Sequence, residues 1–128
     1  KPSPAKGTID LALDRDPWDR RRVTVTDRGG QPSITKYQRR SSNGGYALVQ
    51  CRLITGRMHQ IRVHLAAKGW PIVGDATYGS KDCVAFPRQA LHAWRVVMRQ
   101  PRTGRELTIE APLPPDMQGL AAELGLGE

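Results

Sequence analysis

The feature that most constrains the fold is a tight-turn signal between two β-rich runs. Residues 42–45 read Ser-Asn-Gly-Gly. In residues 46–54, which follow, successive side chains belong in turn to two sets, one for each face of a strand. Alternation over a short run is typical of a strand, and Asn-Gly and Gly-Gly pairs favour the turns that join antiparallel strands. We therefore predict that residues 33–40 and 46–54 form a hairpin.

Other short runs are β-rich and end in turn residues. Residues 23–26 read Val-Thr-Val-Thr before Asp-Arg-Gly-Gly, and Pro-Arg-Thr-Gly lies between residues 90–100 and 106–111. This pattern predicts one strand at 23–26 and a second antiparallel pair further along the chain. We expect the remaining segments to be a lead-in at 1–8 with little reason to order, an extended piece and loop at 71–79, a polar loop at 80–89, and a short helix or tail at 117–126.

Between the two predicted strand pairs, the spacing of apolar residues changes from every second residue, as in a strand, to the spacing of a helix. The apolar positions that share one stripe are Met58, Ile61 and Leu65. The spacing predicts a helix over residues 58–68, with Thr55 placed to cap it and Gly69 to end it. The same segment also alternates, which would suit a strand, but Gly69 followed by Pro71 favours the helix. The predicted fold class is α+β: a mostly antiparallel sheet with one inserted helix.

Length and charge narrow the possible partners. The chain has 128 residues, and 20 Lys and Arg against 12 Asp and Glu give a net charge of +8. This size fits one domain, and this charge favours polyanions such as RNA. No apolar run approaches the roughly 20 residues of a membrane-spanning helix. Two cysteines, Cys51 and Cys83, are too few for a disulfide scaffold or a four-cysteine zinc site.

The densest group of polar side chains lies at the start of the predicted helix. It comprises Arg57, His59, Gln60 and Arg62. A face with cationic and imidazole groups beside a glycine turn could hold a carboxylate, a phosphate or a base edge. The spacing allows equally that Arg62 pairs with a surface acid and that His59 fills a half-buried position. A metal site is not indicated, because His59 and His64 are five residues apart and no His-Glu-x-x-His pattern is present.

Several motifs together resemble the RNA pseudouridine synthases of the large-subunit rRNA/tRNA type. They occur in the order and spacing of that family and span residues 7–117. The matching segments are Leu-Ile-Thr-Gly-Arg-Met-His-Gln-Ile-Arg-Val-His-Leu at 53–65, Gly-Trp-Pro-Ile-Val-Gly-Asp at 69–75, Tyr-Gly at 78–79, Arg-Gln-Ala-Leu-His-Ala at 88–93, Pro-Arg-Thr-Gly at 101–104 and Ala-Pro-Leu-Pro at 111–114.

The resemblance implies a bent, mostly antiparallel sheet with an RNA cleft across it. It also implies the reaction, in which an Asp carboxylate attacks a flipped-out uridine of rRNA or tRNA and the base rejoins the sugar through C5. No cofactor or metal is implied, and we expect a cytoplasmic enzyme that is a monomer when complete. Arg62 matches the arginine that pairs with the catalytic Asp. Arg57, His59 and Gln60 line the same helix start, and we expect them to lie in the cleft and bind RNA. Asp75 and Tyr78 match a loop that is mostly structural.

One family motif has no counterpart in the sequence. The nucleophile of the family lies in Arg-Leu-Asp-x-x-Thr-Ser-Gly, and residues 11–17, which contain Asp14 and Asp16, do not have that form. We therefore expect residues 9–117 to be the C-terminal part of a catalytic domain followed by a tail at 118–128, with the Asp loop upstream of Lys1 and the chain inactive alone. Two alternatives are a non-catalytic RNA-binding module derived from the same fold and a basic domain for protein contacts.

Overall fold

The computed structural model describes residues 2–19, 21–79 and 85–127, and these residues form three small antiparallel sheets and two helices. In chain order the elements are β1 (Lys6–Asp10), β2 (Leu13–Arg15), β3 (Val23–Val25), β4 (Ile34–Asn43), β5 (Tyr46–Leu53), α1 (Gln60–Ala67), β6 (Arg95–Arg99), β7 (Glu106–Glu110) and α2 (Pro115–Glu123). This arrangement confirms the predicted α+β class.

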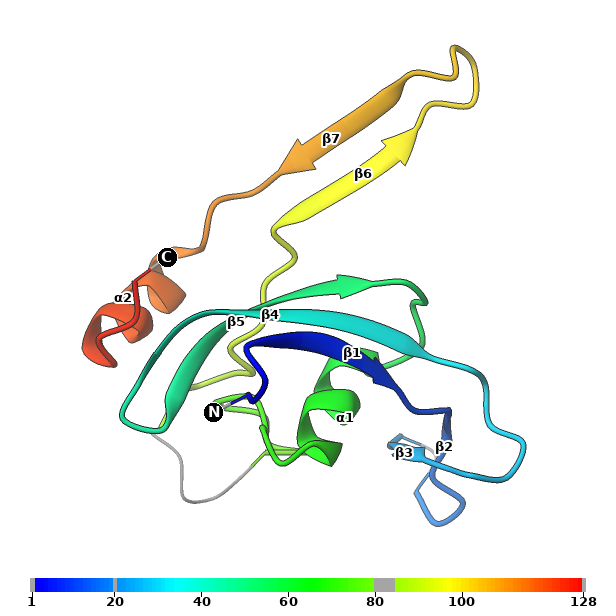
Figure 1. The fold of residues 1–128 in the computed structure, drawn as a ribbon, viewed down its shortest axis with the longest axis horizontal. Coiled ribbons are helices and arrows are strands. Elements are labelled where there is room, and N and C mark those ends of the chain that lie inside the picture. The colour runs from blue at the N-terminus through cyan, green and yellow to red at the C-terminus, as the bar shows by residue number, and fades with distance from the viewer. Residues whose placement is uncertain (1, 20, 80–84, 128) are drawn as a thin grey trace.

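The largest sheet has the strand order β1-β4-β5 and lies over α1 (Figure 1). The β4–β5 hairpin confirms the prediction, with Asn43 opposite Tyr46 and a turn at Gly44 and Gly45. Both glycines have positive φ, 55° and 88°, a region that residues with a side chain rarely adopt. The Asn-Gly-Gly signal therefore predicted this turn for the right physical reason.

Strand β1 corrects the expectation that residues 1–8 have little reason to order. It pairs antiparallel with β4, from Lys6 opposite Gln38 to Asp10 opposite Ile34. A Cβ atom at Gly7 would lie 3.0 Å from the hydroxyl oxygen of Tyr37, so the glycine makes room for the ring across the strands. A strand that contains glycine and charged residues has no clear alternation of apolar and polar residues, so its sequence pattern does not predict it. Its order comes from this long-range pairing.

Two apolar clusters join α1 to the strands. The first contains Ile9, Tyr37, Leu65 and Ile72, all buried, and Trp70 meets Tyr37 edge-on with ring centroids 5.1 Å apart. The second consists of Leu13, Val23 and Val63 of α1, with Tyr78 packed against it. The predicted strand at 23–26 is confirmed as β3, which pairs with the unpredicted β2.

The start of the helix differs from the prediction. α1 begins at Gln60 rather than at residue 58, and Met58 is 45% exposed instead of facing the core. Thr55 does not cap the helix, because its Oγ1 donates to Oε1 of Gln60 and accepts the backbone N–H of Ile34. The end was predicted correctly: Gly69 follows the last turn with a positive φ of 84°.

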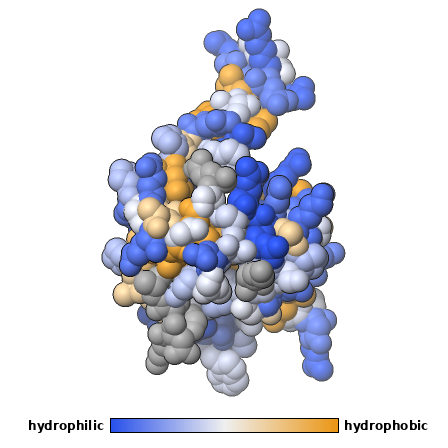
Figure 2. All heavy atoms as spheres, turned by 60° about the vertical axis from the view of Figure 1, so that its left-hand side comes forward, coloured by the Kyte–Doolittle hydropathy of each residue, from blue (hydrophilic) through white to orange (hydrophobic). Residues whose placement is uncertain are grey.

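Strands β6 and β7 form a two-stranded hairpin that extends away from the three-stranded sheet (Figures 1 and 2). The prediction of a strand pair around the turn at 101–104 is confirmed, although β6 begins at Arg95 and residues 90–94, which were expected to be part of the strand, precede it. One face of the hairpin is apolar and the other largely charged, and every residue in both strands is exposed. The directly paired residues are Val96 with Ile109 and Met98 with Leu107 on the apolar face, and Arg95 with Glu110, Val97 with Thr108 and Arg99 with Glu106 on the other.

The remaining predictions have mixed outcomes. α2 confirms the short helix near the C-terminus, although it begins at Pro115 and ends at Glu123. Part of the loop expected at 80–89, and Cys83 with it, lies outside the described residues. Cys51 is partly buried in β5, and this burial raises the pKa of its thiol to about 11. Within the described residues, neither helix is long and apolar enough to cross a lipid bilayer.

Candidate active site

The centre of the candidate site is an ion pair between Arg62 on α1 and Asp75 in the loop that follows it. Nε and Nη2 of Arg62 each donate to one carboxylate oxygen of Asp75 at 2.8 Å. The side chain of Asp75 has no solvent exposure, and that of Arg62 is 13% exposed. Burial alone would raise the pKa of Asp75, but the hydrogen bonds from Arg62 and the nearby backbone outweigh it, so this pKa lies below its usual value.

A tight turn fixes the carboxylate of Asp75. Its Oδ1 also accepts the backbone N–H groups of Thr77 at 3.0 Å and Tyr78 at 3.1 Å. Gly74 before it has a φ of 78°, and a Cβ atom at Gly79 would overlap the carbonyl oxygen of Asp75. The glycines on each side therefore let the chain turn closely around the acid. The two glycines that allow this turn are visible in the sequence, but the partner of Asp75 is not.

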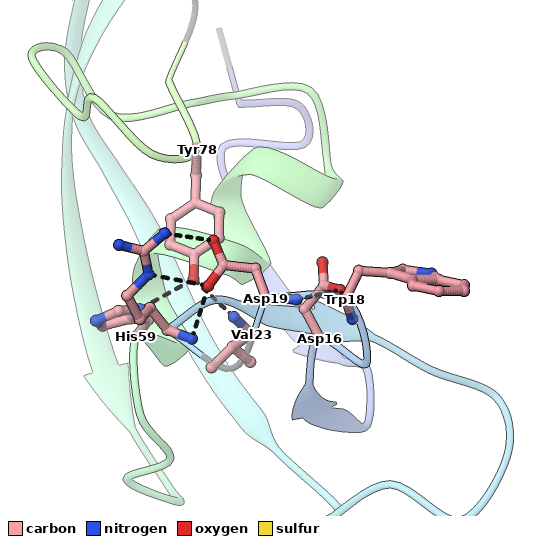
Figure 3. A network of polar contacts seen from close by, with 7 residues as sticks. Asp16, Trp18, Asp19, Val23, His59 and Tyr78 are labelled. Carbon is pink, nitrogen blue, oxygen red and sulfur yellow. Dashed lines mark hydrogen bonds and ion pairs between the residues drawn. The ribbon is translucent and has the colours of Figure 1, made fainter.

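Tyr78 connects this ion pair to the rest of the site. Its hydroxyl accepts the backbone N–H of Val23 at 2.8 Å and is 2.9 Å from Nδ1 of His59 (Figure 3). The guanidinium groups of Arg22 and Arg62 lie 5.3 and 5.0 Å from the centre of its ring, within cation–π range. Tyr78 thus joins β3, the start of α1 and the loop after it. These contacts agree with the expectation that the loop containing Asp75 and Tyr78 is mostly structural.

His59 occupies an unusual backbone conformation just before α1. Its φ is 54°, which makes it the one non-glycine residue with positive φ among the described residues. Such a conformation costs on the order of 1–3 kcal/mol and is found where surrounding contacts hold it. Burial and the charge of Arg62 lower the pKa of His59. The neutral ring can therefore accept the hydroxyl proton of Tyr78 at Nδ1.

Gln60 lies in the interior rather than on the surface of the site, with 2% exposure. Its Nε2 donates to the carbonyl oxygen of Ile34 and to Oγ1 of Thr35, both at 2.9 Å. Its Oε1 accepts from Thr55 at 2.7 Å and from the backbone N–H of Arg57 at 2.9 Å. These four bonds use its full hydrogen-bonding capacity and fix the turn that leads into α1.

The polar chain continues from Gln60 through Thr35 to His64, and both of the latter residues are fully buried. Nε2 of His64 lies 2.8 Å from the carbonyl oxygen of Leu11, and because a carbonyl only accepts, this nitrogen carries the proton. Nδ1 then accepts from Oγ1 of Thr35 at 2.8 Å. Burial lowers the pKa of His64, in keeping with a neutral ring. Spacing did not predict this network, because periodicity gives no information on side-chain partners.

The predicted site residues therefore fall into two groups. Arg62 and His59 share Tyr78, whereas Arg57 is exposed and donates from Nε and Nη2 to the carbonyl oxygen of Pro32 at 3.2 and 3.1 Å. A shallow groove of about 460 Å³ runs between β3 and α1 beside Tyr78. Across the described segments, no three His, Cys, Asp or Glu side chains are grouped as metal ligands would be.

Comparison with known proteins agrees with this architecture. A family model described as RNA pseudouridylate synthase matches residues 1–67. "Uncharacterized RNA pseudouridine synthase YlyB" of Bacillus subtilis is 44% identical over 92% of this chain and 39% of its own length. "Ribosomal large subunit pseudouridine synthase D" of Nitrosomonas europaea is 42% identical over 89% of this chain and 35% of its own length.

Among solved structures, "Human RNA Pseudouridylate Synthase Domain Containing 1" superposes with a TM-score of 0.72 at 28% identity, over 88% of this chain and 50% of that one. The fold is therefore that of the pseudouridylate synthase domains. The chain belongs to the RNA pseudouridylate synthase family. It spans less than half the length of the curated relatives named above.

Proposed function

We propose that this chain forms part of an enzyme that isomerises uridine to pseudouridine in structured RNA, either rRNA or tRNA. In the proposed reaction a carboxylate displaces N1 of the base from C1′ of a flipped-out uridine. C5 of the turned base then displaces the carboxylate from C1′, the proton at C5 is released and N1 regains a proton. The attacking carboxylate belongs to an Asp outside the printed 128 residues, because these contain no Arg-Leu-Asp-x-x-Thr-Ser-Gly motif. We propose that the complete enzyme is a cytoplasmic monomer that uses no cofactor.

The observation that carries this proposal is the way Arg62 is held. Asp75 occupies its Nε and Nη2, and among the described residues no hydrogen bond is made by its Nη1. An arginine fixed on one edge can offer its other edge to a second carboxylate. In the proposed enzyme this second carboxylate is the nucleophile, which Arg62 keeps ionised and oriented.

The surrounding residues support this role. Tyr78 and His59 limit the directions in which the Arg62 guanidinium can move, since the ring of Tyr78 stacks near it and is itself held by His59. We propose that Arg57 and His59 contact RNA, and that Gln60 shapes this contact region by holding the turn at residues 55–60.

The test uses the full-length protein and RNA tritiated at C5 of uridine, because isomerisation releases that hydrogen to water. Arg62→Ala is expected to bind RNA nearly as well as wild type and to lose most turnover. Arg62→Lys keeps a charge beside Asp75 but not the planar fork, so it is expected to fold and to lose at least about tenfold in kcat, or about 1.4 kcal/mol.

The matched control is Arg88→Ala, which removes an equally forked ion pair with Asp116 on the surface. It is expected to retain turnover. Wild-type isomerisation rates in both Arg62 variants would refute the role proposed for Arg62. The 128-residue chain alone is expected to release no tritium, and release above background would show that the nucleophile lies within it.

A further inference from the structure

The face of the β1-β4-β5 sheet that α1 does not cover is basic. α1 lies on one side of this sheet (Figure 1), and Ile9 and Tyr37 are buried in one cluster with Leu65 of α1, so their side chains are on that side. Side chains alternate across a sheet, so the intervening positions project from the opposite face. The cations at these positions are Lys6 on β1, Lys36 and Arg40 on β4, and Arg52 on β5, and all four residues are exposed. We call these four residues the basic sheet face.

Strand register places Lys6, Lys36 and Arg52 in two rows, whereas Arg40 lies where the β4–β5 register shifts between Arg39 and Ser41. Lys36 lies directly opposite Arg52, and Lys6 lies opposite Gln38, which in turn is opposite Gln50. The position of Arg40 follows from its hydrogen bond to Oε1 of Gln50 at 3.4 Å. Directly opposed Cβ atoms are about 5 Å apart, and neighbouring positions on one strand face about 6.7 Å. The face therefore offers positive charge and amide groups at regular short intervals.

This arrangement is costly for the chain by itself. Like charges directly opposite each other, as at Lys36 and Arg52, destabilise a sheet. Asp10 at the end of β1 is the single acidic residue in the three strands, and no ion pair in the described part of the chain involves the basic sheet face. A polyanion would remove this repulsion on binding.

We propose that the basic sheet face binds the phosphate backbone of the RNA substrate, away from the nucleotide that reacts. This inference rests on the proposed function, since RNA is taken as the substrate. It adds a contact surface that is separate from Arg62, which lies on the α1 side of the sheet. Phosphate contacts of this kind fix the position of an RNA and carry little sequence information.

The test is a double substitution, Lys36→Gln with Arg52→Gln, in the 128-residue chain. Binding of fluorescently labelled single-stranded RNA is measured by anisotropy between about 50 and 200 mM salt. Loss of two phosphate contacts is expected to weaken binding at low salt and to lower the slope of log K against log salt by about 1.4. The control, Arg102→Gln with Arg105→Gln, removes the same charge from exposed positions around the β6–β7 turn and is expected to leave the slope unchanged.

Equal losses in the two double variants, or no loss in the first, would overturn the proposal, as would binding to vesicles of anionic lipid but not to RNA. A cooperative thermal melt checks that the first variant folds; if it does not, Lys6→Gln with Arg52→Gln replaces it. In the full-length enzyme the first variant is expected to raise KM and leave kcat unchanged. If instead the role proposed for Arg62 were wrong, the Arg62 variants would keep a wild-type kcat. Each proposal can therefore be refuted independently of the other.

Discussion

Replacing Asp75 by Asn is the most direct test of what holds Arg62 in place. The carboxylate accepts four hydrogen bonds and has no solvent exposure. An amide at this position could keep the three bonds made by Oδ1, but its NH2 group would face Nε–H of Arg62, donor against donor. Removing one partner of a buried ion pair usually costs about 3–5 kcal/mol, and because three bonds can persist we expect about 3 kcal/mol.

The assay is urea unfolding of the 128-residue chain, followed by circular dichroism. With a slope of about 1–3 kcal/mol per molar urea, the midpoint is expected to fall by about 1 M or more. Asp116→Asn is the control, because it removes the same forked geometry toward Arg88 from two partly exposed side chains. Its effect on the midpoint is expected to be much smaller.

Acid pH adds an internal check. The pKa of Asp75 is lowered in the folded chain, so its contribution is complete above the unfolded value of about 3.9 and is lost as the pH falls through the folded value. The difference between wild type and Asp75→Asn is therefore expected to be constant near neutrality and to shrink below about pH 4. A midpoint no lower than that of Asp116→Asn would refute the reasoning that Asp75 anchors Arg62.

Two other perturbations test the polar network around this pair. Tyr78→Phe removes the acceptor of the Val23 N–H and is expected to cost about 1–3 kcal/mol in urea unfolding; an unchanged midpoint would contradict the bridging role of this hydroxyl. The pKa values of His59 and His64 are lowered in the folded chain, so the free energy of unfolding is expected to fall as the pH drops below about 6.5. For each histidine the fall is up to about 1.4 kcal/mol per pH unit, and it stops once the pH is below the pKa of that histidine in the folded chain. His64→Gln should flatten this dependence, and an equally steep profile in that variant would exclude His64 as its source.

Local sequence signals predicted those elements whose causes are local. The turn at Gly44 and Gly45 and the helix end at Gly69 each depend on a positive φ that glycine adopts without strain, and each was placed correctly. Strand β1 was missed because its order depends on pairing with β4, about thirty positions further along the chain. The helix start was misplaced because Thr55 bonds to Gln60 and Ile34 instead of capping, a choice that tertiary contacts make.

The features of the site also divide into those that the local sequence indicated and those that depend on tertiary contacts. Motif order predicted Arg62 as a site residue, which stays a prediction, but composition and spacing could not show that its partner within the chain is Asp75, thirteen residues later. Nor could they show that His59 has a left-handed backbone conformation, because nothing in its side chain favours one. That conformation is held by Tyr78 and the turn of Gln60, which are brought together only when α1 packs against β3 and β4.

The β6–β7 hairpin has a consequence for the behaviour of the chain in concentrated solution. In the described structure each of its strands has one unpaired edge, and its apolar face is open to water. An unpaired strand edge beside such a face can pair with a strand of another chain. The charged residues Arg95, Arg99, Glu106 and Glu110 on the same strands oppose this association. Added salt screens the mutual repulsion of chains carrying +8 without weakening apolar contact, so colloidal stability is greatest at low ionic strength.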